Sequence, residues 1–164
     1  MVRYLTVMRH AKSAWSAGFT NDHARPLNAR GRRDAPRIAA ELVQRQWEPE
    51  LVLGSDSART RETWARMADQ LPEAAACFTP ELYHAGVDPV RRLLQALPSN
   101  RTRVLLLGHN PGFEDVVDWL AGHTVRLTTA NAALLQAEGP SWADALEPGA
   151  WTLHTVLRPK ELSP

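Results

Sequence analysis

The sequence predicts a three-layer α/β/α sandwich with a mostly parallel central sheet, and three observations support this fold class. Apolar runs of strand length alternate with amphipathic helical patterns as far as Gly122. The run at 103–108 is apolar almost throughout, which is typical of a strand covered on both faces in a parallel sheet. Two strand patterns without an intervening helix occupy the C-terminal part. Because 164 residues fit one domain and no linker or repeat divides them, we expect a single domain over residues 1–164.

The N-terminal part is expected to contain a strand, a polar loop and a long helix. β-Branched and aromatic residues predict the strand over residues 3–8, and a polar loop follows it. Asn28 is a suitable N-cap for the helix after the loop. Pro36 conflicts with an uninterrupted helix, so it either kinks a helix that starts near Asn28 or lies in the first turn of a helix capped by Asp34. We favour the kinked helix.

The rest of the chain continues the alternation of strands and helices. The run at 51–54 predicts the second strand, and Ser55, Asp56 and Ser57 offer caps for the helix that follows it. Apolar residues recur at helical spacing in that helix as far as Leu71. The later elements are a strand at 76–79, a helix that starts at 88, a strand at 103–108, a helix through 113–120, and strands at 131–138 and 151–157.

Composition excludes several functional classes. A hydrophobic fraction of 44% and a charged fraction of 23% are ordinary for a soluble globular protein, and a net charge of +1 gives no reason to expect a nucleic-acid partner. The single cysteine, Cys77, excludes an internal disulfide and a cysteine-based zinc site, and its apolar neighbours predict burial. No segment resembles a signal peptide and no apolar run reaches membrane-spanning length, so the cytoplasm is the expected location.

We also expect no metal ion and no cofactor. Four histidines other than His10 and His109 have no second ligand at metal-binding spacing. We interpret them as surface or hydrogen-bonded residues: His23, His84, His123 and His154.

Cationic and titratable residues follow three of the predicted strands. Arg9 and His10 follow the first strand, Arg59 lies near the start of the helix after the second, and His109 follows the strand at 103–108. Because the carboxyl ends of strands in an open α/β sheet meet at one edge, we expect these side chains to converge there. Arginine binds phosphate oxygens in a bidentate manner, helix N-termini favour anions, and a neutral imidazole is a nucleophile. The sequence therefore predicts a pocket that holds a tetrahedral phosphoryl group without a metal ion.

Four blocks of sequence resemble the histidine phosphatase superfamily and, within it, the small phosphohistidine phosphatases of the SixA type. They are residues 8–13 (Met-Arg-His-Ala-Lys-Ser), residues 22–27 ending in Arg-Pro-Leu, residues 55–63, and residues 108–112 (Gly-His-Asn-Pro-Gly). The blocks stand in the family's order, and the match extends from residue 3 to about residue 122. The resemblance implies a phosphoglycerate mutase-like fold. Ala11-Lys12 departs from the larger family, which often has Gly and then an acidic or amide residue, but agrees with the small members.

The resemblance also implies roles for individual residues. His10 would be the nucleophile that takes the phosphoryl group as a phosphohistidine, which water later cleaves. Arg9, Arg59 and His109 would bind the phosphate and stabilise the charge during transfer. Arg25 resembles an additional phosphate-pocket arginine of the small members.

Three further motif residues are expected to contribute to substrate binding: Lys12, Ser13 and Asn110. Lys12 would raise the positive potential at the mouth of the pocket and attract anionic substrates. We prefer Arg59 to Arg61 as the phosphate ligand, because the family's arginine lies four positions after the serine that opens its block.

Glu81 occupies about the position where many relatives carry an acid, so it is the candidate proton donor. The alternative interpretation is an exposed loop glutamate. An imidazole leaving group needs little help to depart, whereas a sugar alkoxide needs a general acid. Dependence of the rate on Glu81 would therefore favour an ester substrate.

The leading hypothesis for the function is a metal-independent phosphatase that forms a phosphohistidine on His10 and acts on phosphohistidine in a partner protein. The chain is too short for large insertions around the pocket, which favours a side chain presented by a protein. The alternative substrate is a small phosphate ester, such as a sugar phosphate, cleaved by the same mechanism. A third hypothesis is a phosphate-binding module without turnover, in which His10 is never phosphorylated. We expect neither a nucleic acid nor a membrane as a partner, and the oligomeric state stays open.

Overall fold

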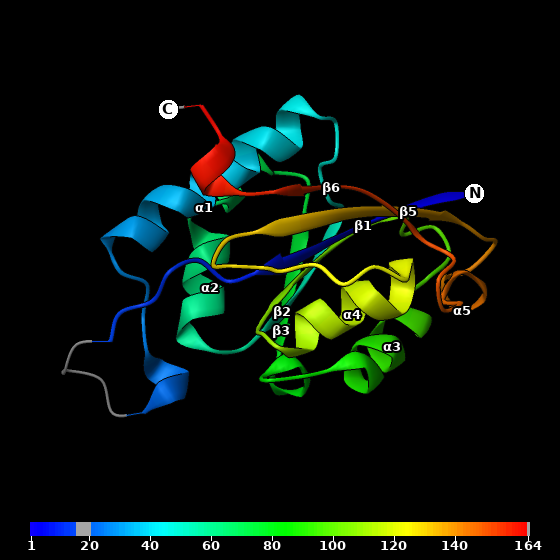
Figure 1. Ribbon diagram of the computed structural model, residues 1–164, viewed down its shortest axis with the longest axis horizontal. Helices are drawn as coiled ribbons and strands as arrows, with labels where there is room; N and C mark the ends of the chain where they lie inside the picture. Colours follow the sequence, from blue (N-terminus) through cyan, green and yellow to red (C-terminus); the bar gives the residue numbers. More distant parts are fainter. Residues whose placement is uncertain (16–20, 164) are drawn as a thin grey trace.

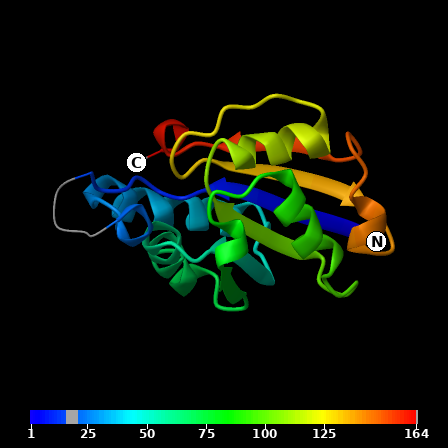
Figure 2. The same cartoon turned by 90° about the horizontal axis from the view of Figure 1, so that it is seen from below.

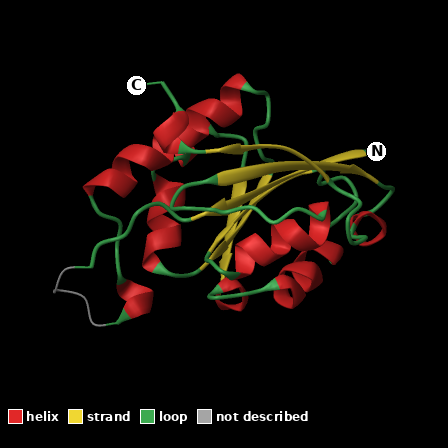
Figure 3. Ribbon diagram, viewed as in Figure 1, coloured by secondary structure: helices red, strands yellow, loops and turns green. Residues whose placement is uncertain are grey.

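A six-stranded sheet forms the middle layer of the protein (Figures 1 and 3). The computed structural model describes residues 1–15 and 21–163. The strands are β1 (Val2–Arg9), β2 (Leu51–Ser55), β3 (Ala75–Thr79), β4 (Arg103–Gly108), β5 (Ala132–Glu138) and β6 (Thr152–Leu157). Their order across the sheet is β3-β2-β4-β1-β5-β6. The first four strands in this order are parallel, whereas β5 is antiparallel to both β1 and β6, so the predicted mostly parallel sheet is confirmed.

Helices cover both faces of the sheet (Figure 1). One face packs against α1 (Ala29–Gln44) and α2 (Ala58–Ala65), and the other packs against α3 (Val87–Gln95), α4 (Gly112–Ala121) and the short α5 (Trp142–Ala145). Figure 2 looks onto the face that carries α3 and α4. The alternation within β4 shows why two layers of helix are needed. Val104 and Leu106 point into one core, Leu105 and Leu107 into the other, and each is at most 2% exposed.

The long N-terminal helix begins where the sequence predicted. The Asn28 side chain accepts a hydrogen bond from the Gly31 backbone N–H at 2.9 Å, which caps α1. Pro36 lies inside this helix rather than in the first turn of a shorter one. A Cβ atom on Gly31 would lie 2.1 Å from the Lys12 carbonyl oxygen. Glycine therefore allows α1 to pack directly against the segment that follows β1.

Three details differ from the sequence-based expectations. The helix expected to reach Leu71 is shorter, because α2 ends at Ala65. The Met67 N–H donates to the Trp64 carbonyl three residues back, and the 3₁₀ helix η2 (Ala68–Gln70) follows. Cys77 is exposed rather than buried, because β3 is an edge strand of the sheet. The C-terminal strands are joined by a segment that contains α5, which periodicity did not indicate.

The remaining 3₁₀ helices are η1 (Asp22–Ala24), η3 (Pro80–Leu82) and η4 (Pro159–Glu161). Part of the polar loop predicted after β1, residues 16–20, lies outside the described residues. Within residues 1–15 and 21–163, no helix is long and apolar enough to cross a membrane.

Candidate active site

The carboxyl ends of β1, β4 and β2 lie side by side and bring the predicted residues together. In the register of the sheet, Arg9 pairs with Gly108, and the His10 backbone N–H donates to the Gly108 carbonyl at 3.0 Å. His109 therefore follows β4 beside His10, with 5.3 Å between the centroids of the two rings. The predicted convergence of His10, Arg59 and His109 is present in the structure, and we refer to this group together with Asp22, Arg25, Tyr83 and His84 as the cup.

The His10 ring is oriented so that one nitrogen has a free lone pair. Its Nδ1 lies 2.7 Å from the Ala11 carbonyl oxygen, so Nδ1 carries the proton and Nε2 does not. Nε2 accepts a hydrogen bond from Arg59 Nε at 3.3 Å. Burial lowers the pKa of His10 to about 3, and the charges of Arg59, Arg9 and Arg25 add to this effect, although the hydrogen bond to Ala11 opposes it. The ring is therefore neutral near neutral pH, the form in which imidazole is a nucleophile.

Arg59 connects the two histidines at the base of the cup. It lies in the first turn of α2, whose N-cap is Ser57, and it is 2% exposed. Besides its bond to His10, its Nη1 donates to the Asp22 carbonyl oxygen at 2.8 Å, and its Nη2 donates to Asp22 Oδ2 at 3.0 Å. The same Nη2 lies 3.4 Å from His109 Nδ1. One buried cation thus faces both rings.

His109 has the tautomer opposite to that of His10. Its Nε2 lies 2.8 Å from the Ser55 Oγ, and its Nδ1 faces the Arg59 donor, so Nε2 carries the proton. Burial is the main cause that lowers the pKa of His109 to about 2; the neighbouring His10, Arg59 and His84 contribute to this shift, and Asp22 opposes it. Both rings at the base of the cup are therefore uncharged, and its positive charge comes from arginine.

Asp22 is a central residue of the cup that the sequence analysis did not assign. Its Oδ1 accepts from Arg25 Nη2 at 3.0 Å, while its Oδ2 accepts from Arg59, from the Tyr83 hydroxyl, and from His84 Nε2 at 3.3 Å. Although burial raises the pKa of Asp22, the hydrogen bonds from Tyr83, Arg25 and Arg59 and the charge of Arg59 hold it well below its usual range. The carboxylate is therefore ionised and neutralises part of the charge of the two arginines.

Tyr83 and His84 were also missed, although one signal could have indicated them. They follow β3 and η3, and β3 is parallel to β2, so its carboxyl end points to the same edge of the sheet. The Tyr83 and His84 rings lie 5.4 Å and 5.0 Å from the His109 ring. His84 was interpreted as a surface or hydrogen-bonded histidine, and it is both exposed and hydrogen-bonded to Asp22. The rule that placed His109 at this edge applies equally to residues that follow β3.

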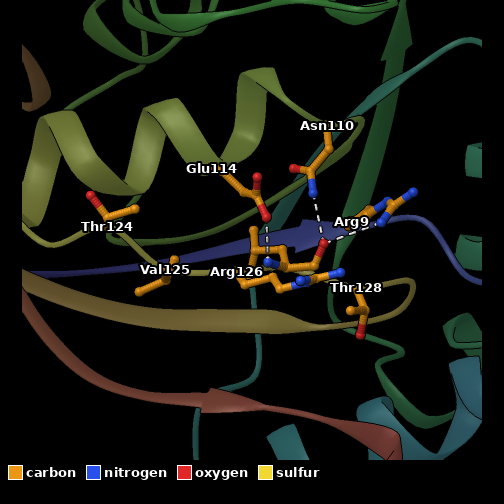
Figure 4. A pocket seen from close by; sticks show the side chains of 8 residues that line it. Arg9, Asn110, Glu114, Thr124, Val125, Arg126 and Thr128 are labelled. Carbon is orange, nitrogen blue, oxygen red and sulfur yellow. Dashed lines mark hydrogen bonds between the residues drawn. The ribbon is translucent and has the colours of Figure 1, made fainter.

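Arg9 is the last residue of β1 and lines an open cavity of about 570 Å³ (Figure 4). Its Nη1 donates to the Leu127 carbonyl at 3.2 Å, and the Asn110 Nδ2 donates to the same oxygen. Glu114 accepts from the Leu127 backbone N–H. Two buried atoms here lack a hydrogen-bond partner among the described residues, Arg9 Nε and Asn110 Oδ1. Arg9 and Asn110 therefore hold the loop around Leu127 and retain hydrogen-bonding capacity next to the cup.

The other predicted residues divide into two groups. Arg25 is 5% exposed and donates to the Ser13 Oγ, so both belong to the wall of the cup. Lys12 makes its described contact through the backbone, where its carbonyl accepts from the Asn28 N–H at 3.0 Å. Glu81 is exposed in η3, where its backbone N–H donates to the Thr79 Oγ1. The structure therefore brings Arg25 and Ser13 to the cup and gives Lys12 and Glu81 no described side-chain contact with it.

Comparison with known proteins assigns the chain to a family. The model of the histidine phosphatase superfamily (branch 1) matches residues 5–84. An uncharacterized chloroplastic protein of Arabidopsis thaliana is 38% identical over 170 residues, which cover 96% of this chain and 78% of that protein. This chain belongs to the histidine phosphatase superfamily.

Two solved structures resemble this histidine phosphatase over almost its whole length. One is a candidate phosphohistidine phosphatase, SixA, from Nakamurella multipartitia, with 27% sequence identity, a TM-score of 0.86 and 97% of each chain covered. The other is the protein histidine phosphatase SixA complexed with tungstate, with 28% identity, a TM-score of 0.82, and 99% of this chain and 100% of that chain covered. The phosphoglycerate mutase-like fold of the SixA type, expected from the motifs, is confirmed.

Proposed function

We propose that this histidine phosphatase hydrolyses phosphohistidine in a partner protein through a covalent phosphohistidine intermediate on His10, without a metal ion. The observation that carries the proposal is the state of His10. Its ring is buried, uncharged and oriented by Ala11, and its Nε2 lone pair faces the Arg59 guanidinium. A nucleophile held beside a fixed cation is suited to attack a phosphoryl group.

In the first step, the His10 Nε2 lone pair attacks phosphorus, and the bond between phosphorus and the leaving group breaks. Phosphoryl transfer passes through a loose transition state with charge on the three equatorial oxygens, so cationic donors in fixed positions contribute most of the catalysis. Arg59 meets this need because its Nε–H, which bonds to His10 in the free protein, is released to a phosphate oxygen when Nε2 forms its bond to phosphorus. The unpartnered Nε of Arg9 and the guanidinium of Arg25 supply further hydrogen-bond donors to the phosphate oxygens.

In the second step, water attacks phosphorus and the bond to His10 Nε2 breaks, which returns the lone pair to the ring. The hydrogen bond from Nδ1 to the Ala11 carbonyl holds the ring in one orientation through both steps. The same contact partly offsets the positive charge that the ring carries while it is phosphorylated. The net reaction consumes one water and releases inorganic phosphate.

The exposure of the cup supports a side chain of a folded protein as the substrate. His10, Arg59 and His109 at the base are at most 5% exposed, whereas the side chains of Asp22 and His84 are 42% and 54% exposed. A phosphorylated side chain that approaches from the exposed side therefore meets Asp22 and His84 before the buried histidines. The tungstate complex of SixA is compatible with a phosphoryl substrate of either kind, because tungstate is a tetrahedral oxyanion like phosphate. The single cysteine is compatible with the cytoplasm as the site of this reaction.

A substrate comparison tests the proposal. The protein is incubated with a phosphohistidine-containing phosphocarrier protein and, separately, with a panel of sugar phosphates, and kcat/KM is measured for release of inorganic phosphate. We expect the phosphohistidine protein to give the higher kcat/KM by at least about tenfold, EDTA to have no effect, and His10→Ala to abolish release from every substrate. A sugar phosphate with the higher kcat/KM would overturn the protein substrate and favour the small-ester alternative. Binding without any release would identify a phosphate-binding module instead.

A further inference from the structure

When the leaving atom is oxygen, the reaction needs a group that donates a proton to it. The base of the cup provides no such group. An alkoxide departs far more slowly than an alcohol, so a general acid must protonate it. His10 and His109 are uncharged near neutral pH because burial lowers the pKa of each. Asp22 is ionised because its hydrogen bonds keep its pKa well below the usual range. None of these three side chains holds a proton that it readily gives up.

His84 lies at the mouth of the same cup, in a backbone conformation that few non-glycine residues adopt. Its φ of 54° is in the left-handed region, which few non-glycine residues adopt and which recurs at functional sites. Its ring lies 4.1 Å from the Tyr83 ring and 5.0 Å from the His109 ring. Because its side chain is 54% exposed, the outer part of a substrate can reach it.

The packing of α4 holds His84 in this place. A Cβ atom on Gly112 would lie 1.8 Å from the Ala85 carbonyl oxygen, so only glycine lets the first turn of α4 approach the backbone this closely. This contact fixes the residue directly after His84 next to the segment that begins with His109. On its other side, His84 Nε2 lies 3.3 Å from Asp22 Oδ2, a carboxylate oxygen that accepts a hydrogen bond from the ring. The ring is therefore held in position beside His109, with the Asp22 carboxylate next to its Nε2.

The direction of the displacement places the leaving group on the same side as His84. Attack by His10 from the buried base requires the leaving atom to lie opposite, in line, and therefore toward the open rim. On the basis of the function proposed above, we propose that His84 is the proton donor to the leaving group, and that this donor extends the substrate range to phosphate esters of unactivated alcohols.

The proton balance closes over the two steps. As the bond between phosphorus and the leaving oxygen breaks, its electron pair stays on that oxygen, which takes the proton of the His84 imidazolium and leaves as an alcohol. His84 is then neutral. When water attacks the phosphohistidine, the neutral His84 accepts one proton from that water, and the imidazolium is restored with release of inorganic phosphate.

Two other side chains are less suited to this role. The Tyr83 hydroxyl donates to Asp22, and burial together with that bond raises the pKa of Tyr83, so it retains its proton. Glu81 is exposed, and its described contact is the backbone bond to Thr79. Glu81 nevertheless belongs in the test, because it follows the same strand end.

The experiment compares aryl phosphates whose leaving groups differ in basicity. His84→Asn is the informative variant, because asparagine tolerates the left-handed conformation but has no titratable proton. With phenyl phosphate, which has a poor leaving group, we expect kcat/KM to fall about 100-fold or more. With 2,4-dinitrophenyl phosphate, whose leaving group needs no proton, we expect a fall of less than about threefold. A side chain that is only structural would affect both substrates equally.

Two matched variants complete the design. His123→Asn makes the same substitution at an exposed histidine after α4, and Glu81→Gln removes the proton donor expected from the sequence. We expect neither variant to change the dependence of kcat/KM on leaving-group basicity. Equal losses with both esters in His84→Asn, or a selective loss in Glu81→Gln instead, would overturn the assignment of His84. If the unaltered protein formed no phosphohistidine on His10 with 2,4-dinitrophenyl phosphate, the proposed function itself would fail, which is a separate outcome.

Discussion

Arg59→Ala removes the cation that joins the two histidines, and we expect it to lower kcat/KM by about 10²–10³. The Arg59 guanidinium makes four polar contacts, with His10, with the Asp22 carbonyl, with the Asp22 carboxylate and with His109. Deleting one preorganised donor that faces a developing negative charge typically costs about 2.7–4 kcal/mol in the transition state, which is the source of the expected range. The charge is buried, so water does not replace it without a further cost.

Arg61→Ala is the matched control for this measurement, because it deletes the same side chain in the same helix. Arg61 is exposed, its Nε donates to the Asp56 carbonyl at 3.0 Å, and its guanidinium lies over the Phe78 ring. We expect its kcat/KM with a chromogenic phosphate ester to stay within about twofold of the unaltered protein. Thermal melts of both variants show whether each is folded at the assay temperature. A loss below tenfold in Arg59→Ala, or an equal loss in Arg61→Ala, would refute the assignment of Arg59.

Three further predictions concern pH, charge and packing. Burial favours the neutral forms of His10 and His109, so the unfolded chain binds more protons than the folded chain below about pH 6.5. The free energy of unfolding should therefore fall on acidification, by up to about 1.4 kcal/mol per pH unit for each of the two histidines. Urea titrations between pH 7 and 4 should therefore show a shallower fall for His10→Asn, and an unchanged slope would contradict the burial effect. Asp22→Asn removes a negative charge that faces the cup, so the inhibition constant of inorganic phosphate should fall about three- to tenfold. A rise would mean that the carboxylate acts mainly by holding the arginines. Gly112→Ala forces a Cβ against a backbone carbonyl and should lower stability by about 1–3 kcal/mol, whereas Gly86→Ala, where a Cβ meets nothing within 4 Å, should not. Similar melting temperatures for these two variants would show that α4 does not pack closely there.

Those parts of the site that follow from local patterns and one topological rule were predictable from the sequence. Asn28 and Ser57 cap their helices through contacts within three residues, so the sequence alone indicates both starts. The strand ends converge because parallel strands with helical crossovers place their carboxyl ends at one edge. That rule accounts for the meeting of His10 with Arg59 and His109.

The parts that depend on packing between distant segments were not predictable. Asp22 meets Tyr83 and His84 because η1 packs beside α2 and contacts the residues that follow η3, and these contacts join residues about sixty positions apart. A histidine in a loop has no periodic pattern that reveals its partner, so His84 resembled a surface residue. Arg9 was expected in the phosphate pocket with His10, and the additional hydrogen bond from its Nη1 to the Leu127 carbonyl is a contact that no local signal indicated.

The exposed cysteine illustrates the same limit in the sheet. Cys77 stands between Ala76 and Phe78, and such apolar neighbours normally indicate burial. Burial depends on the place of the strand in the sheet, and β3 is at the edge beside β2. The order of strands arises from tertiary packing, so it was not available from the residues of β3 alone.

The most direct test of the account is to trap and locate the phosphoryl group. The protein is mixed with 2,4-dinitrophenyl phosphate, quenched under alkaline conditions that preserve phosphohistidine, and analysed by peptide mass spectrometry. We predict one phosphoryl group on His10, and none in His10→Ala. A phosphoryl group on another residue, or turnover in His10→Ala, would contradict the claim that the lone pair of His10 carries the reaction.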